Sequence, residues 1–107
     1  MPTPHRLVLV TCSSLSEARK VARAVVEKQL AACVNIHSAP VESIYRWKGK
    51  REEAEEWLLL IKTTAAAFDR VRDAIEEMHS YELPECLCLA IEGGSAEYLR
   101  WLGESVE

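Results

Sequence analysis

The residues best suited to chemistry gather in one short segment, His79-Ser80-Tyr81-Glu82-Leu83-Pro84-Glu85. It places an imidazole, a phenol and two carboxylates between a helical pattern that ends near Met78 and an apolar strand pattern that begins near Cys86. Loops of this kind present side chains that a packed strand or helix must bury, and Pro84 restricts the backbone just before the strand. These groups suit metal binding, ligand binding or proton transfer. The alternative is a helix C-terminus capped by His79 with a polar turn behind it.

The four cysteines fall at positions with strand character: Cys12, Cys33, Cys86 and Cys88. A reduced thiol in a strand behaves as a small apolar side chain, and the sequence shows no export signal, so disulfides are not expected. Cys86 and Cys88 point to the same face of their strand, which is compatible with a soft metal. Zinc sites usually need four ligands from two such clusters, so this pair does not predict one.

The chain has 107 residues and a net charge of −4, which indicates a single domain over residues 1–107 that is marginal as a monomer. Its basic cluster of Lys48, Lys50 and Arg51 runs directly into the acidic segment 52–56, which predicts a self-compensating, solvated surface. This balance argues against a nucleic-acid partner. The N-terminus lacks an apolar signal region, and no apolar run approaches the roughly 20 residues of a membrane span. We therefore expect no membrane partner and a cytoplasmic location.

Hydrophobic periodicity predicts an alternation of strands and helices. A capping box of Ser14 and Glu17 opens the first helix, and Thr63-Thr64 are candidate caps for the second. The expected elements are a strand at 6–12, a helix at 15–30, strands at 31–36, 41–47 and 53–64, a helix ending at Met78, a buried strand at 85–91 and a short helix from 95. This order predicts an α+β, ferredoxin-like fold (βαββαβ plus a C-terminal helix), with two helices on one face of an antiparallel four-stranded sheet.

The two strands at 41–47 and 53–64, joined by a turn at 48–50, predict a long β-hairpin arm. Twelve extended residues reach about 40 Å, whereas a domain of this size has a radius of gyration near 13 Å, so the arm should overhang the body. Tyr45, Trp47 and Trp57 are then exposed aromatic residues on an unpaired edge, which proteins seldom leave uncovered. We expect neighbouring subunits of a closed homotrimer to cover them. The alternative is an arm folded back over its own sheet.

Five blocks of sequence resemble the CutA divalent-cation tolerance family: Ala31-Ala32-Cys33-Val34-Asn35, Tyr45-x-Trp47-x-Gly49-Lys50, Glu55-Glu56-x-Leu58-Leu59-Leu60-Ile61-Lys62-Thr63, His79-x-Tyr81-Glu82-x-Pro84-Glu85 and Tyr98-Leu99-x-Trp101-Leu102. The resemblance implies a ferredoxin-like subunit in a homotrimer, usually cytoplasmic in bacteria, that is linked to tolerance of copper and other divalent ions. Relatives in animals are associated with anchoring acetylcholinesterase. Neither role is an enzyme activity.

The resemblance also implies where copper binds. The proposed positions are the cysteine that ends the first strand, here Cys12, and histidines at the turn, here His79. Met78 stands where a second histidine can stand, and Ser80 replaces the common proline. Thiolate and imidazole suit copper, and a thioether adds a soft ligand, but Met78 continues the apolar helical stripe, which favours the core. The C-terminus of a helix favours the charged form of His79, so protons should compete with the metal for this side chain below about pH 6.

A second hypothesis is a non-enzymatic trimeric signalling or ligand-binding module. Its small-molecule site, in a cleft between subunits, would be lined by Tyr81, Glu82, Glu85, Lys62 and Arg46. A third is acid-base or hydrolytic catalysis by His79 with Glu82 or Glu85, but no nucleophile stands in a recognisable setting. We therefore expect a protein without enzyme activity.

Overall fold

The computed structural model describes residues 3–107. In chain order the elements are β1 (His5–Cys12), α1 (Leu15–Glu27), β2 (Cys33–Ile36), β3 (Val41–Trp47), β4 (Lys50–Thr64), α2 (Phe68–Met78), β5 (Leu87–Ala90) and α3 (Ala96–Glu104). None of the helices in this range is long and apolar enough to cross a membrane.

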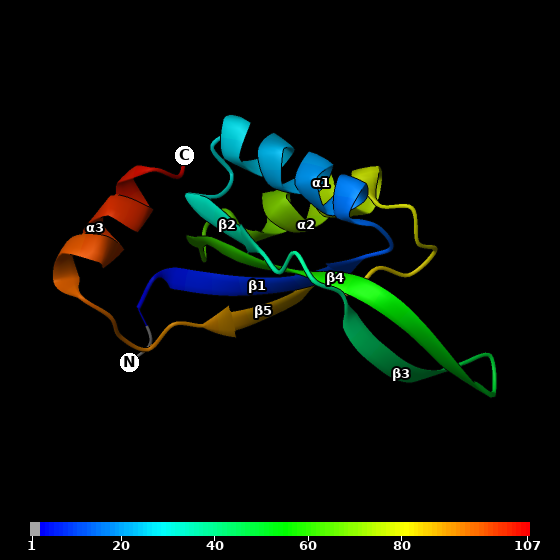
Figure 1. The fold of residues 1–107 in the computed structure, drawn as a ribbon. Helices are drawn as coiled ribbons and strands as arrows, with labels where there is room; N and C mark the ends of the chain where they lie inside the picture. Colours follow the sequence, from blue (N-terminus) through cyan, green and yellow to red (C-terminus); the bar gives the residue numbers. More distant parts are fainter. Residues whose placement is uncertain (1–2) are drawn as a thin grey trace.

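The sheet has the strand order β2-β4-β1-β5 with antiparallel pairing throughout, and β3 pairs with the outer half of β4. Helices α1 and α2 lie side by side over one face of the sheet, and α3 lies at the end remote from the arm (Figure 1). The predicted ferredoxin-like topology is confirmed.

The core lies between the sheet and the two helices. Because side chains alternate along a strand, one face of β1 and β4 contributes every second residue to it, and each helix contributes an apolar stripe. Burying a Val, Leu or Ile side chain stabilises the fold by roughly 1.5–3 kcal/mol. The fully buried residues include Val8, Val10, Leu59 and Ile61 from the sheet and Val21, Val25, Val71 and Ile75 from the helices.

Helix α1 begins where the sequence predicted, since the Ser14 hydroxyl accepts a hydrogen bond from the Glu17 backbone N–H at 3.0 Å. It ends at Glu27, earlier than the predicted residue 30. Gln29 adopts a left-handed conformation (φ 58°), and the Leu30 N–H bonds the Val25 carbonyl. This hydrogen bond is typical of a Schellman motif. The motif ends the helix at Glu27, although the sequence pattern continues to residue 30.

The predicted caps of the second helix are wrong, because Thr63 and Thr64 end β4. Thr63 is fully buried, and its hydroxyl donates to the Leu30 carbonyl at 2.6 Å. The Thr64 hydroxyl accepts from the Ala67 N–H within the turn, and Ala67, which has no side-chain cap, precedes the helix. Both threonines therefore lie in β4, and neither caps α2.

The hairpin of β3 and the outer half of β4 projects from the body as an arm (Figure 1), and the molecule measures 44 × 28 × 24 Å. Lys48 and Gly49 form its two-residue turn with φ of 51° and 80°, as a type I′ hairpin turn requires. Tyr45 is 45% exposed, as predicted. The prediction for Trp57 is wrong: it pairs opposite Cys12, packs against the core and donates its indole N–H to the Ser38 carbonyl.

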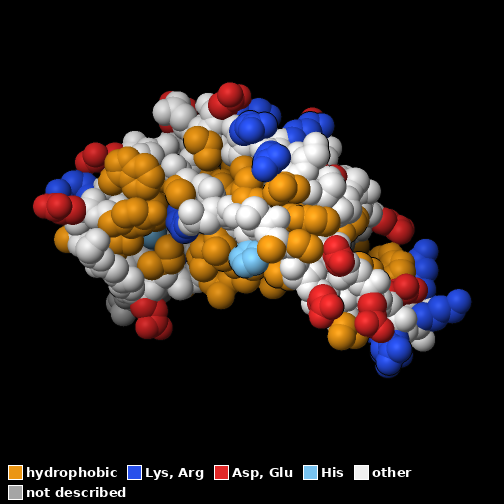
Figure 2. All heavy atoms as spheres, viewed as in Figure 1, with side chains coloured by type: hydrophobic (Ala, Val, Ile, Leu, Met, Phe, Trp, Pro, Cys, Tyr) orange, Lys and Arg blue, Asp and Glu red, His pale blue; other side chains and the backbone are white. Residues whose placement is uncertain are grey.

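The sheet face opposite α1 and α2, called here the open face, is apolar. Pairing registers place six leucines on it: Leu7, Leu9, Leu58, Leu60, Leu87 and Leu89. Hydrophobic side chains reach the surface on that lower side of the body (Figure 2).

The predicted burial of the 85–91 strand is wrong for the single chain. β5 is a sheet edge, where Leu87 is 54% and Leu89 43% exposed. All four cysteines are free.

Candidate functional site

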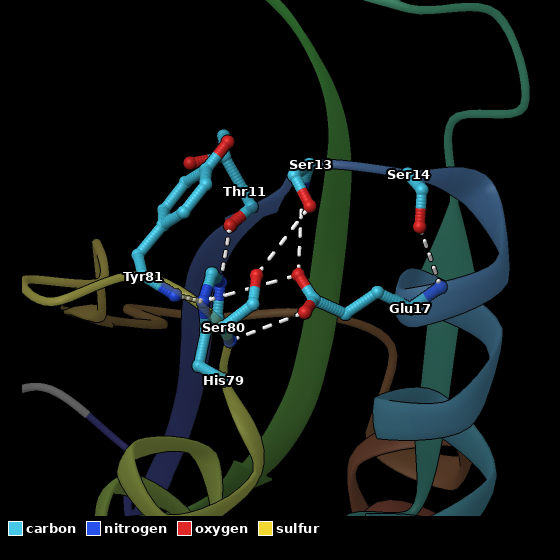
Figure 3. A network of polar contacts seen from close by, with 7 residues as sticks. All are labelled: Thr11, Ser13, Ser14, Glu17, His79, Ser80 and Tyr81. Carbon is cyan, nitrogen blue, oxygen red and sulfur yellow. Dashed lines mark hydrogen bonds and ion pairs between the residues drawn. The ribbon is translucent and has the colours of Figure 1, made fainter.

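The loop after α2 meets the start of α1 at the end of β1. His79 directly follows α2, and its side chain reaches the backbone of β1, while Glu17 reaches the same loop from the first turn of α1 (Figure 3). The site is therefore assembled from two segments that are distant in sequence, residues 11–17 and 79–81, and the buried core beneath it fixes their positions.

His79 is buried, and both ring nitrogens have partners. Nε2 lies 2.7 Å from the Thr11 carbonyl oxygen, and Nδ1 accepts a hydrogen bond from the Tyr81 N–H at 3.1 Å. Because a carbonyl oxygen only accepts, Nε2 carries the proton and Nδ1 carries the lone pair. Metal-binding histidines are held in the same way, with the non-ligating N–H donated to a carbonyl.

Glu17 connects the two loops. Its carboxylate accepts hydrogen bonds from the Ser13 N–H at 3.3 Å and the Ser80 N–H at 3.1 Å, and it lies 3.9 Å from Nδ1 of His79. Burial alone would raise the pKa of Glu17, but the bonds from Ser80 and Ser13, together with His79, lower it below the ordinary value. The carboxylate is therefore ionised at neutral pH.

Cys12 completes a compact group of donors. Its sulfur, a Glu17 oxygen and a ring nitrogen of His79 all lie within 4.8 Å of one another. Burial, followed by the neighbouring Glu17 carboxylate, raises the pKa of the Cys12 thiol to about 12. The thiol is protonated at neutral pH, and a metal that binds it must displace that proton.

Met78 does not join this group. It packs against the hydrophobic core, as its place in the helical stripe predicted.

A separate groove of about 800 Å³ lies between the arm and the loop that follows His79. We call it the acidic groove. Its lining includes Thr11, Ser43, Ile44, Tyr45, Arg46, Trp47 and Glu56 from the strands, and Tyr81, Glu82, Leu83, Pro84, Glu85, Cys86 and Leu87 from the loop and the start of β5. A volume of this size accommodates a small organic molecule.

The acidic groove contains ionisable groups with altered properties. Glu56 is only 9% exposed. Burial, then a hydrogen bond from the Tyr81 hydroxyl to Glu56, raises the pKa of Tyr81. Desolvation, then the charge of Glu56, raises the pKa of Glu85. The prediction that the charged segment 52–56 is a uniformly solvated surface is therefore wrong at Glu56, although Arg51 and Glu53 do form an exposed ion pair.

The structure brings together most of the residues singled out in the sequence. Cys12 and His79 lie in one cluster, and Tyr81, Glu82, Glu85 and Arg46 line one groove. Lys62 lies outside that groove, on the open face opposite Leu7.

Sequence reasoning missed two members of these sites, Glu17 and Glu56. It assigned Glu17 only a capping role. For Glu56 a signal was available, because strand alternation places it on the same face as Leu58 and Leu60.

The fold and the cluster define a class: a small ferredoxin-like domain with a protruding hairpin and a sulfur, oxygen and nitrogen donor set beside its first helix. The family model described as CutA1 divalent ion tolerance protein matches residues 6–105. The chain belongs to this family.

Individual relatives agree along the whole domain. The divalent-cation tolerance protein CutA of Archaeoglobus fulgidus is 44% identical over 104 residues, covering 96% of this chain and 99% of the relative. The human protein CutA is 44% identical over 107 residues, covering 100% of this chain and 59% of the human protein.

Solved structures are equally similar. The divalent cation tolerance protein (Cut A1) of Thermus thermophilus superimposes with a TM-score of 0.93 at 45% identity, covering 96% of this chain and 99% of that structure. The CutA of Archaeoglobus fulgidus, described as periplasmic, superimposes with a TM-score of 0.92 at 43% identity. The match covers 96% of this chain and 99% of that structure.

Proposed function

We propose that this divalent-cation tolerance protein binds copper through Cys12, Glu17 and His79. One observation carries the proposal, namely that a thiol, a carboxylate and an imidazole nitrogen lie within 4.8 Å of one another. Thiolate and imidazole are ligands that copper prefers, and Nδ1 of His79, which carries the lone pair, lies 3.9 Å from the Glu17 carboxylate. Direct ligation of Nδ1 replaces its hydrogen bond from the Tyr81 N–H.

The donor set fits copper, but the metal must displace the proton of the Cys12 thiol. Because the pKa of that thiol is about 12, binding at neutral pH releases about one proton. The Glu17 charge, which disfavours the thiolate, in turn favours a bound cation.

Titration of the intact protein with Cu(I) and with Cu(II), followed by calorimetry, tests this function. We expect about one site per subunit for at least one of the two ions, lost in Cys12→Ser and His79→Ala and weakened in Glu17→Gln. Cys88→Ser is the matched control, because Cys88 is exposed on β5, outside the cluster. Isotherms unchanged in both Cys12→Ser and His79→Ala would remove the site.

We also propose that the chain assembles as a homotrimer. The leucines of the open face and the two sheet edges, β2 and β5, are uncovered in the single chain, as is Tyr45 on the arm. A trimer is the smallest closed ring in which each copy contacts two different neighbours, and closure covers the free edges.

Light scattering tests the assembly. The wild-type mass should correspond to three chains, and the double change Leu87→Asp, Leu89→Asp should lower it. Val26→Asp is the control, because this partly exposed residue lies on α1 away from the open face. A monodisperse wild-type monomer would contradict the proposal.

We further propose a cytoplasmic, non-enzymatic role. Neither ring nitrogen of His79 hydrogen-bonds a hydroxyl group, so the nearby serines are not activated as nucleophiles. Fractionation of the source cells, with a periplasmic marker as the reference, tests the location.

A second candidate function is a ligand-binding module in which the acidic groove holds a small molecule. The groove supports it, because four of the predicted residues, Tyr81, Glu82, Glu85 and Arg46, line one concave surface beside the arm. In this proposal Lys62 reaches the ligand from a neighbouring subunit. A Lys62→Ala variant with unchanged ligand binding would exclude Lys62 from the site.

A further inference from the structure

Lys62 is a basic residue on the open face that has no acidic partner in its own chain. It lies two residues before the end of β4, opposite Leu7 on β1 and Cys33 on β2, and it is partly buried. No ion pair within residues 3–107 includes it. An ammonium group among apolar side chains is stabilised when a carboxylate is brought close to it.

Glu56 is the complementary residue, an acid without a basic partner in its own chain. It is 9% exposed, and it lies on the same face of β4 as Lys62, because the two positions are an even number of residues apart. Arg46 lines the acidic groove beside Glu56 but is exposed, and no ion pair within residues 3–107 includes either of the two. A buried carboxylate is costly unless a cation pairs with it.

The two charges are too far apart to pair within one chain. Residues in a strand rise about 3.3 Å each, so Glu56 and Lys62 lie about 20 Å apart along β4. An ion pair requires the nitrogen and the oxygen to lie within about 4 Å of one another. Glu56 and Lys62 can therefore meet only across a contact between two copies of the chain.

The order of side chains along β4 gives such a contact a direction. Leu58 and Leu60 separate the negative charge at the arm end of the open face from the positive charge at its far end. In a closed ring each copy uses two different patches, one for each neighbour. A head-to-tail contact, arm end against far end, brings opposite charges together, whereas a head-to-head contact brings like charges together, which is costly. The two charges therefore favour the head-to-tail contact that a closed ring needs.

From these two unpaired charges on one apolar face, we propose that Lys62 of each subunit forms an ion pair with Glu56 of its neighbour. The neighbour's ammonium group then enters the acidic groove, where Glu85 also lies. The charge of Glu56 contributes to the raised pKa of Glu85, so a cation placed there is favoured by both carboxylates. The methylene stem of Lys62 covers apolar surface on the way. This inference rests on the proposed homotrimer and is independent of copper.

Charge reversal at each position tests the pair. Lys62→Glu and Glu56→Lys each bring like charges together, so the concentration at which half of the protein is trimeric should rise at least about tenfold. The double change Lys62→Glu, Glu56→Lys restores an attractive pair and should recover most of that loss. Light scattering over a dilution series measures the mass, and circular dichroism checks the fold. Lys20→Glu and Glu27→Lys are the matched controls, because they make the same charge changes at exposed positions of α1, away from the open face.

The outcomes separate the ion pair from the trimer itself. If the wild type is monomeric at every concentration, the homotrimer and the inference fall together. If the wild type is trimeric but the double change dissociates as readily as the two single changes predict by addition, the inference is wrong and the trimer stands.

A second measurement needs no substitution. A carbodiimide activates a carboxylate, and the amine of a lysine in contact with it then forms an amide bond and releases the urea. The reagent is applied to trimers assembled from a mixture of unlabelled and isotopically labelled chains, and the tryptic peptides are identified by mass spectrometry. We expect an amide between Glu56 and Lys62 in peptides whose masses show that two chains contributed. Lys62 joined to a different carboxylate, or joined to none, would overturn the inference.

Discussion

Replacing Glu17 by Gln should destabilise the protein through the loss of one charged bridge between two loops. The carboxylate accepts from the Ser13 and Ser80 N–H groups, and its side chain is only 13% exposed. Gln keeps one acceptor oxygen, so about one of these two bonds is lost. Hydrogen bonds to charged groups contribute about 1.5–3 kcal/mol each, which predicts a loss of about 2 kcal/mol in the free energy of unfolding at pH 7.

The lowered pKa of Glu17 determines how its contribution to the free energy of unfolding changes with pH. Because the folded pKa of Glu17 is lower than the unfolded pKa, its stabilisation is fully present above the unfolded value and is lost as pH falls through the folded value. Protonated Glu resembles Gln, so the difference between wild type and Glu17→Gln should shrink as the solution is acidified below the unfolded pKa.

Urea unfolding followed by tryptophan fluorescence, at equal protein concentration and at a series of pH values, measures this difference. Glu97→Gln is the control, because Glu97 is an exposed acidic residue in the first turn of α3 and makes no side-chain hydrogen bond among those found in residues 3–107. It should change stability by about 0.5 kcal/mol or less. A loss in Glu17→Gln no larger than in this control, or one that stays constant with pH, would refute the bridging role.

Three further predictions concern single positions. Thr63→Val should cost about 1–3 kcal/mol in urea unfolding, because it leaves the buried Leu30 carbonyl without its 2.6 Å hydrogen bond; an unchanged midpoint would contradict this. Gly49→Ala should cost about 1 kcal/mol by the same measurement, since its φ of 80° strains any residue with a Cβ, and Lys50→Ala beside it serves as the control. Copper affinity should fall about tenfold for each pH unit of acidification below neutrality, because the Cys12 thiol, with a pKa of about 12, releases one proton on binding; calorimetric affinities independent of pH would exclude the thiolate as a ligand.

The sequence was informative wherever one local pattern had one physical outcome. The apolar run at 6–12 predicted β1, and the pairing of Ser14 with Glu17 predicted the first residue of α1, because a helix cap depends on a few neighbouring atoms. The composition of the loop singled out His79, and the resemblance added its pairing with Cys12, which the structure places beside it.

The sequence was less informative where the outcome depends on tertiary placement. Leu87 and Leu89 read as a buried strand, but β5 lies at the sheet edge, and only the strand order shows this. Trp57 read as part of the arm, but the register with Cys12 places it against the core. Glu56 read as a surface charge, because the groove wall that buries it comes from a loop far along the chain.

The two proposed sites meet at one residue, Tyr81. The Tyr81 N–H donates to Nδ1 of His79, and the Tyr81 side chain lines the acidic groove together with Glu56. The lone pair on Nδ1 serves either that N–H or a metal, so copper bound at the proposed site would free the Tyr81 backbone from His79. If that release alters the groove, linkage requires that copper and a groove ligand change one another's affinity by the same factor. We therefore predict that any coupling between the proposed metal cluster and the groove runs through the short loop from His79 to Tyr81.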